Sequence, residues 1–223
     1  MTRARLTPAA VVADAAALAD EAGFDALTLS AVARRLGVQT ASLYSHVRDR
    51  AALLDGVTAL ALAEVAARIA AGIAGRSGRP ALRAYADAFR DYAREHPGRW
   101  AALQRRAGPA AVAAPSAVDV VTLTDALLRG YAVPASERVH VIRVLGATIS
   151  GFVTLEGIGS YDHSAPAPDE SWDRAVDALD TLLRSWPAAP QPDPDRAGDP
   201  AGHPDPADEP DPAGRPDPQE SPR

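Results

Sequence analysis

The chain has 223 residues, of which 47% are apolar, enough to bury a sizeable core in one or two domains. It contains no cysteine, which excludes disulfides and thiolate metal sites. No run of 18 uncharged apolar residues and no signal-peptide core is present, so the sequence predicts a soluble, cytoplasmic protein.

The formal net charge of −6 lies entirely in residues 187–223, which hold nine acids and three Arg. The rest of the chain carries equal numbers of acids and bases, so the acidity does not argue against nucleic-acid binding there. Residues 1–50 have a net charge of +1. The basic side chains of that segment are Arg3, Arg5, Arg34, Arg35, Arg48 and Arg50.

The first expected element is a helix that begins after Thr7 and ends at Gly23. The Thr7 hydroxyl suits an N-cap, and Pro8 suits the first helical position because its missing N–H has no partner to lose there. Apolar residues then recur at helical spacing up to Gly23, which closes the helix.

Two short helices joined by a tight turn are expected next. Val32 and Leu36 mark the buried stripe of the first helix, and Leu43 and Val47 mark that of the second. Gly37 stands between them, where a tight turn favours a positive φ. This spacing is typical of a helix-turn-helix.

The outer face of the second short helix suits the major groove. It offers short donors and acceptors and two flat rings, followed at once by arginines that suit phosphates. We expect base contacts from the helix face and phosphate contacts from its flanks. The predicted DNA-binding residues are Thr28, Thr40, Ser42, Tyr44, His46, Arg48 and Arg50.

A long helix is predicted from Arg50 to about Ile73, with Asp49 as its N-cap. At 1.5 Å per residue it would be roughly 37 Å long and would connect the helix-turn-helix to the rest of the chain. An irregular loop is expected near residues 108–115. The remaining predicted helices are 80–96, 98–107, 116–131, 136–157 and 169–186.

The stretch GVQTASLYSHVRDRAALLD resembles the signature of the TetR family of bacterial repressors, including its Leu-Tyr-x-His-Val core. Gln39 departs from the small capping hydroxyl that is common at its position in this family. Ser45 departs from the bulky or basic residue that is common at its own.

The resemblance implies an all-α protein with a three-helix DNA-binding domain at 1–50 and a helical effector-binding and dimerisation domain at 51–186. Its implied function is ligand-responsive transcriptional regulation, as a repressor. A homodimer would bind a palindromic operator on double-stranded DNA, and a small-molecule effector would release it.

Three segments, EHPGRWAAL, LLRGY and LGATISGFVTLEGIGSYD, resemble the ligand-binding half of an actinobacterial TetR subgroup. That subgroup's C-terminal domain is named for a Trp-His-Gly signature. The chain departs from it at Ser150-Gly151, where the subgroup has His before Gly.

The second half of the chain carries more aromatic and polar groups on apolar helix faces than a scaffold needs, as small-molecule sites do. For any one of these residues, a place in the core or on a solvated face is the alternative. The predicted effector-binding residues are Phe89, Trp100, Tyr131, His140, Arg143 and Ser150.

The last predicted helix carries an apolar seam of near-heptad spacing. With the helix before it, it is expected to pack against its symmetry mates as a four-helix bundle. The alternative is that the seam only closes the core of its own subunit. The predicted interface residues are Ile149, Trp172, Val176, Leu179 and Leu183.

Residues 187–223 repeat Pro and Asp in a six-residue period and have almost no large apolar side chain. Such a segment cannot offset its ordering entropy, so it is predicted to be a disordered spacer without a partner.

Enzymes are disfavoured, because the five His have no metal-ligand spacing and neither a phosphate loop nor a nucleophile elbow occurs. No cofactor is predicted. A helical interaction module without DNA binding is the alternative to a regulator.

Overall fold

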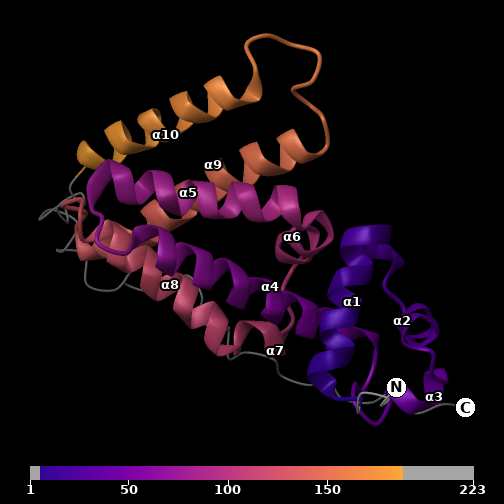
Figure 1. Cartoon of the computed structure of the whole chain (residues 1–223). Helices are drawn as coiled ribbons and strands as arrows, with labels where there is room; N and C mark the ends of the chain where they lie inside the picture. The colour runs from indigo at the N-terminus through magenta and orange to yellow at the C-terminus, as the bar shows by residue number, and fades with distance from the viewer. Residues whose placement is uncertain (1–5, 188–223) are drawn as a thin grey trace, which may run out of the picture. The chain divides into compact units, whose positions relative to one another are not determined.

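The computed structural model describes residues 6–187, and every regular element in that range is helical (Figure 1). The all-α prediction is confirmed for these residues. Arg3, Arg5 and the predicted disordered segment beyond Pro187 lie outside them. The α-helices are α1 Pro8–Ala22, α2 Leu29–Leu36, α3 Thr40–Leu43, α4 Arg50–Ile73, α5 Gly78–Glu95, α6 Pro97–Gln104, α7 Pro109–Val112, α8 Pro115–Leu128, α9 Arg138–Gly157 and α10 Pro168–Arg184.

Three of these helices begin at a side chain that caps them. Thr7, Thr28 and Asp49 each accept a hydrogen bond from the backbone N–H three residues further on, at 3.1, 3.1 and 2.7 Å. Each cap satisfies a donor that has no partner inside the helix and contributes about 1 kcal/mol. The starts of α1, α2 and α4 are therefore set by local sequence.

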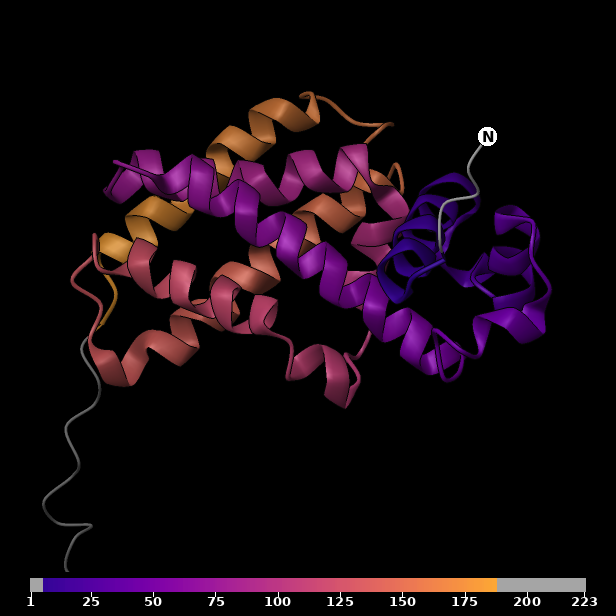
Figure 2. The ribbon, with the colours of Figure 1, turned by 60° about the horizontal axis from the view of Figure 1, so that its bottom comes forward.

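The N-terminal helices share one hydrophobic core with the start of α4. Figure 2 shows the ribbons of these helices in indigo and violet. Val11, Val32 and Leu43 from α1, α2 and α3 are fully buried in it, as is Leu53 from α4. Gly37 joins α2 to α3 at φ 66°, in the left-handed region that favours glycine. The predicted helix-turn-helix is present, and we call α1 to α3 the head.

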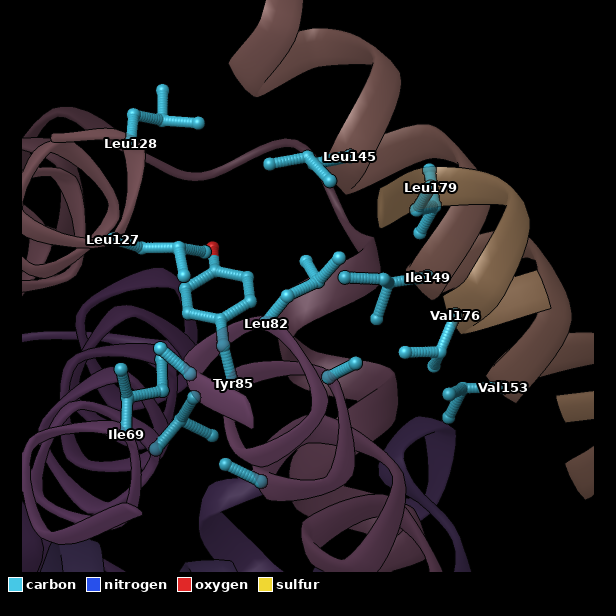
Figure 3. Packing of buried hydrophobic residues seen from close by; sticks show 14 of the residues in the cluster. Ile69, Leu82, Tyr85, Leu127, Leu128, Leu145, Ile149, Val153, Val176 and Leu179 are labelled. Atoms are coloured by element: carbon cyan, nitrogen blue, oxygen red, sulfur yellow. The ribbon is translucent and has the colours of Figure 1, made fainter. Parts of the chain in front are cut away.

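A second core is built by α4, α5, α8, α9 and α10, which we call the body. Figure 3 shows Ile69 from α4, Leu82 and Tyr85 from α5, and Leu145 and Ile149 from α9 converging in it. α4 packs along α5 and α8 and begins in the head, so one rod of 24 residues belongs to both cores.

The structure departs from the expected helices at several places. α3 ends at Leu43, before Val47, and α8 ends at Leu128 instead of 131. α6 ends at Gln104 instead of 107, because Arg105 takes extended backbone (φ −82°, ψ 160°) and its guanidinium lies 3.0 Å from the Asp55 carboxylate of α4. The loop expected before α8 contains α7, a four-residue helix. So short a helix has no apolar period that a sequence pattern could reveal.

The predicted dimer-interface residues lie in the core of the subunit itself. Trp172, Val176, Leu179 and Leu183 from α10 and Ile149 from α9 are each at most 5% exposed. Figure 3 shows Val176 and Leu179 near Ile149 and Val153 of α9. The assignment of these five residues to the interface is therefore wrong, and the alternative, that the seam closes the subunit's own core, holds.

Candidate functional site

The recognition unit is anchored from inside and exposed outside. Leu43 and Val47 are buried in the head core, as their spacing predicts. After Leu43 the chain continues in turns, with the His46 N–H bonded to the Leu43 carbonyl at 2.8 Å. Tyr44 is 57% exposed on this unit. Apolar anchors thus hold a polar face toward solvent.

The other predicted base-contacting residues differ in access. Ser42 is exposed, whereas Thr40 and His46 are half-buried. Gln39 is the N-cap of α3 without a side-chain bond, so α3 begins at Thr40. The Ser45 hydroxyl donates to the Ser42 carbonyl at 2.8 Å and braces the turn.

The arginines of the head differ in whether their charge is already paired within the protein. Arg35 is bound to Asp14 and Glu21 of α1, and these partners raise its pKa further. It fastens α2 to α1 and is a poor source of charge for DNA. The Arg34 side chain is exposed and makes no ion pair or hydrogen bond within residues 6–187. The charge available to DNA is therefore smaller than a count of arginines suggests.

The predicted phosphate-binding residues flank the recognition unit. Arg48 has an exposed side chain, paired with Asp49 at 2.8 Å. Arg50, in the first turn of α4, donates from Nε to the Leu27 carbonyl at 2.7 Å, which leaves its terminal nitrogens without a bond among the described residues. The Thr28 hydroxyl caps α2 and also lies 3.1 Å from the Ser30 hydroxyl.

A cavity of about 430 Å³ opens between the ends of α5 and α9 and the helix α6. Its volume lies in the range of small-molecule sites. Its apolar wall is Ala93, Pro97, Trp100, Ala101, Val153 and Ile158. Its polar groups are Arg94, Gln104, Thr154 and Glu156. The hollow of about 560 Å³ beside α7 is walled by residues 106–113 alone and is a surface depression.

Of the six predicted effector-binding residues, the structure brings only Trp100 into the wall of this cavity. Phe89 packs edge-on against the Trp100 ring at 6.3 Å, behind that wall. Tyr131 is buried and donates to Asp180 at 2.6 Å, on α10. His140 and Arg143 are exposed on α9. These four residues and Ser150, which is half-buried, do not line the cavity.

The sequence reasoning missed Arg94, Gln104 and Glu156. A weak signal was available, since Gln104 follows Trp100 by one helical turn and shares its face. The Trp100 indole donates to the Thr154 hydroxyl at 3.3 Å across the cavity wall. Which charged side chains meet at the ends of α5 and α9 depends on tertiary packing, which helical spacing does not encode.

A cluster of four charges borders the cavity. Arg90 is 4% exposed, donates to Glu156 at 2.9 Å, and lies over the rings of Trp172 and Phe152. Arg94 lies 3.0 Å from Glu156 and 2.9 Å from Asp169. The hydrogen bond from Arg90 is the main cause that lowers the pKa of Glu156. The cluster is electrically balanced.

α6 touches the cavity on one side and the head on the other. Gly98 lies so close to α1 that an added Cβ would be 2.0 Å from the Ala19 carbonyl oxygen. The N–H of Arg99 donates to Asp20 of α1 at 2.9 Å, and its guanidinium lies 3.0 Å from Glu64 of α4. Movement of α6 would therefore displace both α1, which is part of the head, and α4, which follows the head.

Known proteins share both halves of the chain. Residues 11–57 match the family model described as bacterial regulatory proteins, tetR family, and residues 82–179 match the one described as tetracyclin repressor-like, C-terminal domain. An uncharacterized HTH-type transcriptional regulator of Mycobacterium tuberculosis, Rv0681, is 29% identical over 71% of this chain and 74% of its own length.

Two further relatives carry more descriptive names. The tetracycline repressor protein class A from transposon 1721 of Escherichia coli is 39% identical over 42% of this chain and 48% of its own length. A variant of TetR from Acinetobacter baumannii AYE, in complex with minocycline, has a TM-score of 0.61 at 22% identity, with 83% of this chain and 98% of that one covered. The chain belongs to the TetR family of bacterial transcriptional regulators.

Proposed function

We propose that the chain is a repressor that binds a palindromic operator as a homodimer and leaves it when a small molecule occupies the cavity. The observation that carries the proposal is the recognition unit, whose polar face is exposed while Leu43 and Val47 hold it on the head core. The relative from transposon 1721 is itself described as a repressor.

In this proposal the recognition unit enters the major groove, where Ser42 and Tyr44 reach base edges, with Thr40 and His46 closer to the head core. Arg48 and Arg50 bind phosphates on either side of the start of α4, whose N-terminus also favours an anion.

The dimer is proposed to form through the outer faces of α9 and α10, since their inner faces are buried in the core of the subunit. Gly146 and Ala147 are exposed on α9, and a Cβ on Gly146 would meet nothing within 4 Å. Leu182 is 37% exposed on α10. Small residues on an exposed face allow another helix to approach closely, as an isologous four-helix bundle requires.

The test of this interface is Leu182→Glu, compared with Val121→Glu on α8, which is 50% exposed. We expect sedimentation of the full chain to show a folded monomer for Leu182→Glu and a dimer for Val121→Glu. The reverse result would assign the interface to α7 and α8, where Val112, Val118 and Val121 are exposed.

The effector is proposed to occupy the cavity beside Trp100 and to act through α6. A ligand shifts the protein only by binding one state more tightly than the other, and α6 gives it contact with both α1 and α4. The bound minocycline of the Acinetobacter baumannii structure supports a small-molecule ligand for a protein of this fold. A ligand-bound state that increases the distance between the two heads of the dimer would prevent them from docking simultaneously in successive major grooves.

We also propose membership in the Trp-His-Gly subgroup, on the three C-terminal segments that resemble it, and a cytoplasmic location. Arg50–Ile73 and Ala135–Gly157 are long and apolar enough to cross a membrane by length and composition alone. Both supply residues to the protein core, such as Val57 and Leu145, as core helices of soluble proteins do.

An electrophoretic mobility shift on the chain's own upstream region separates the two candidate functions. A regulator should give a discrete complex that Ser42→Ala alters in sequence preference. A helical interaction module would give none at physiological salt.

A further inference from the structure

We propose that the cavity selects an apolar organic anion, whose carboxylate or similar acidic group binds Arg94 while its body packs on Trp100. This inference rests on the proposed effector site and specifies the chemical class of its ligand.

The walls fix the first property of the ligand. Trp100 offers one face of a large ring system, and five aliphatic residues complete the apolar wall. The polar edge of Trp100 is already satisfied by Thr154, so the indole presents mainly apolar surface. A body of aromatic or branched aliphatic carbon fits this surface, because it removes the most apolar area from water.

The charges fix the second property. Glu156 accepts one hydrogen bond from Arg90 on Oε2 and hydrogen bonds from both Arg90 and Arg94 on Oε1. A cationic ligand would have to compete with two guanidinium groups for this one carboxylate. Glu156 is therefore a poor receptor for an amine.

Arg94, unlike Glu156, has donors that can bind a ligand. Both of its hydrogen bonds use Nη2, toward Glu156 and Asp169, so Nε and Nη1 make none among residues 6–187. Its side chain is 49% exposed and lies in the cavity wall. Nε and Nη1 lie on different edges of the guanidinium, and each shares its edge with Nη2. A ligand carboxylate that replaces Asp169 at Nη2 can therefore bind Arg94 by two hydrogen bonds, one to Nη2 and one to Nε or Nη1.

Asp169 makes room for the incoming charge. Its side chain is 75% exposed in the first turn of α10, and it shares Arg90 and Arg94 with Glu156. A ligand carboxylate that displaces it keeps the cluster electrically balanced. Arg90 cannot follow the ligand outward, because Glu156 and the two rings hold it in the interior.

The experiment titrates the full chain calorimetrically with three compounds that share one aromatic body: 2-naphthoate, 2-naphthamide and 2-naphthylmethylammonium. We expect naphthoate to bind about tenfold more tightly than naphthamide, and the ammonium compound to bind most weakly. Arg94→Gln should remove the preference for naphthoate and leave naphthamide unchanged. Arg129→Gln, at the exposed end of α8, is the charge-matched control and should keep the preference.

Asp169→Asn distinguishes displacement from simple loss of charge balance. It removes the competitor for Arg94, so naphthoate should bind about two- to fivefold more tightly, with naphthamide unaffected. Weaker naphthoate binding in this variant would show that Asp169 supports the site, and would overturn the displacement argument.

Ala101→Trp separates failure of the ligand class from failure of the site. Ala101 is exposed and lines the cavity, so a large ring there fills the space without removing core packing. If all three compounds bind equally, or the ammonium compound binds best, and Ala101→Trp blocks them, the site stands and the anionic class is wrong. If none binds, or if Ala101→Trp leaves binding unchanged, the cavity is not the effector site.

Discussion

Gly98 of α6 is the point at which the smallest substitution should have the largest effect. In Gly98→Ala the new Cβ would lie 2.0 Å from the carbonyl oxygen of Ala19, 2.1 Å from its carbonyl carbon and 2.5 Å from the N atom of Asp20. All three are backbone atoms of α1, so no side chain can turn aside. The two helices must separate by more than 1 Å to restore ordinary van der Waals distances, since 3.4 Å is the lower limit of such contacts.

The separation would break the bonds that meet at Asp20. Its carboxylate accepts the Arg99 N–H at 2.9 Å and lies 3.2 Å from Nδ1 of His96. Loss of a hydrogen bond to a charged group costs about 1.5–3 kcal/mol, and overpacking costs about 1–3 kcal/mol. We expect Gly98→Ala to lower the free energy of unfolding by about 2.5–6 kcal/mol, a large part of the roughly 5–15 kcal/mol of a typical protein.

The measurement is guanidinium unfolding followed by circular dichroism at one fixed protein concentration, because the proposed dimerisation would make stability concentration-dependent. Gly157→Ala, at the end of α9, is the control: its Cβ would meet nothing within 4 Å, so stability should be unchanged or raised by up to about 1 kcal/mol. A loss of less than about 1 kcal/mol in Gly98→Ala would refute the close contact between α6 and α1.

Three further outcomes are expected. Arg50→Ala should weaken binding to all DNA sequences alike and reduce the slope of log affinity against log salt concentration by about one. Arg174→Ala, the control, should leave this slope unchanged. An unchanged slope in Arg50→Ala would exclude the phosphate contact. The pKa of Glu156 is held below its usual 4.5, chiefly by Arg90, so its contribution to stability is complete above that pH and is lost as the pH falls below it. The free energy of unfolding should therefore fall less steeply with decreasing pH in Glu156→Gln than in the unsubstituted chain. Parallel curves for the two proteins would contradict the ion pair. Deletion of residues 188–223 removes a net charge of −6, so non-specific DNA affinity should rise modestly at low salt with little change in melting temperature, and a large drop in melting temperature would show that the tail docks.

The features that sequence predicted best are those set by local chemistry. Thr7 and Asp49 are caps in the sequence pattern and caps in the structure, since a hydroxyl or carboxylate before a helical run has a partner three residues away. Thr28, which was predicted to bind phosphate, is also a cap. Leu43 and Val47 are buried as their spacing predicts, although α3 itself ends at Leu43 and Val47 follows in irregular backbone.

The features that sequence missed depend on what a helix packs against. The period of Trp172, Val176 and Leu179 shows that one face of α10 is buried, but it does not tell a neighbouring helix of the same subunit from a symmetry mate. α5 and α9 cover that face, and Trp172 donates to Asp87 of α5 at 2.7 Å. Leu179→Glu would consequently destabilise the subunit itself, and Leu182 is the informative position for the dimer.

The residues that line the cavity show the same limit. Trp100 was identified because it is an aromatic on an apolar helix face, and it does line the cavity. Arg143 was selected as a polar group on the apolar face of α9, but it lies exposed, because the cavity meets only the last turns of that helix. The pairing of Arg94 with Glu156 joins residues 62 positions apart, which no helical period relates.

The central claim, that two heads of one dimer read a symmetric operator, is tested most directly by selecting DNA sites from a random library with the full-length chain. We expect the enriched sequences to be palindromes, with half-sites about one helical turn or a multiple of it apart. Leu182→Glu should fail to enrich them, whereas Val121→Glu should enrich the same palindromes. Enrichment of a single asymmetric site, or no enrichment above background, would contradict the claim.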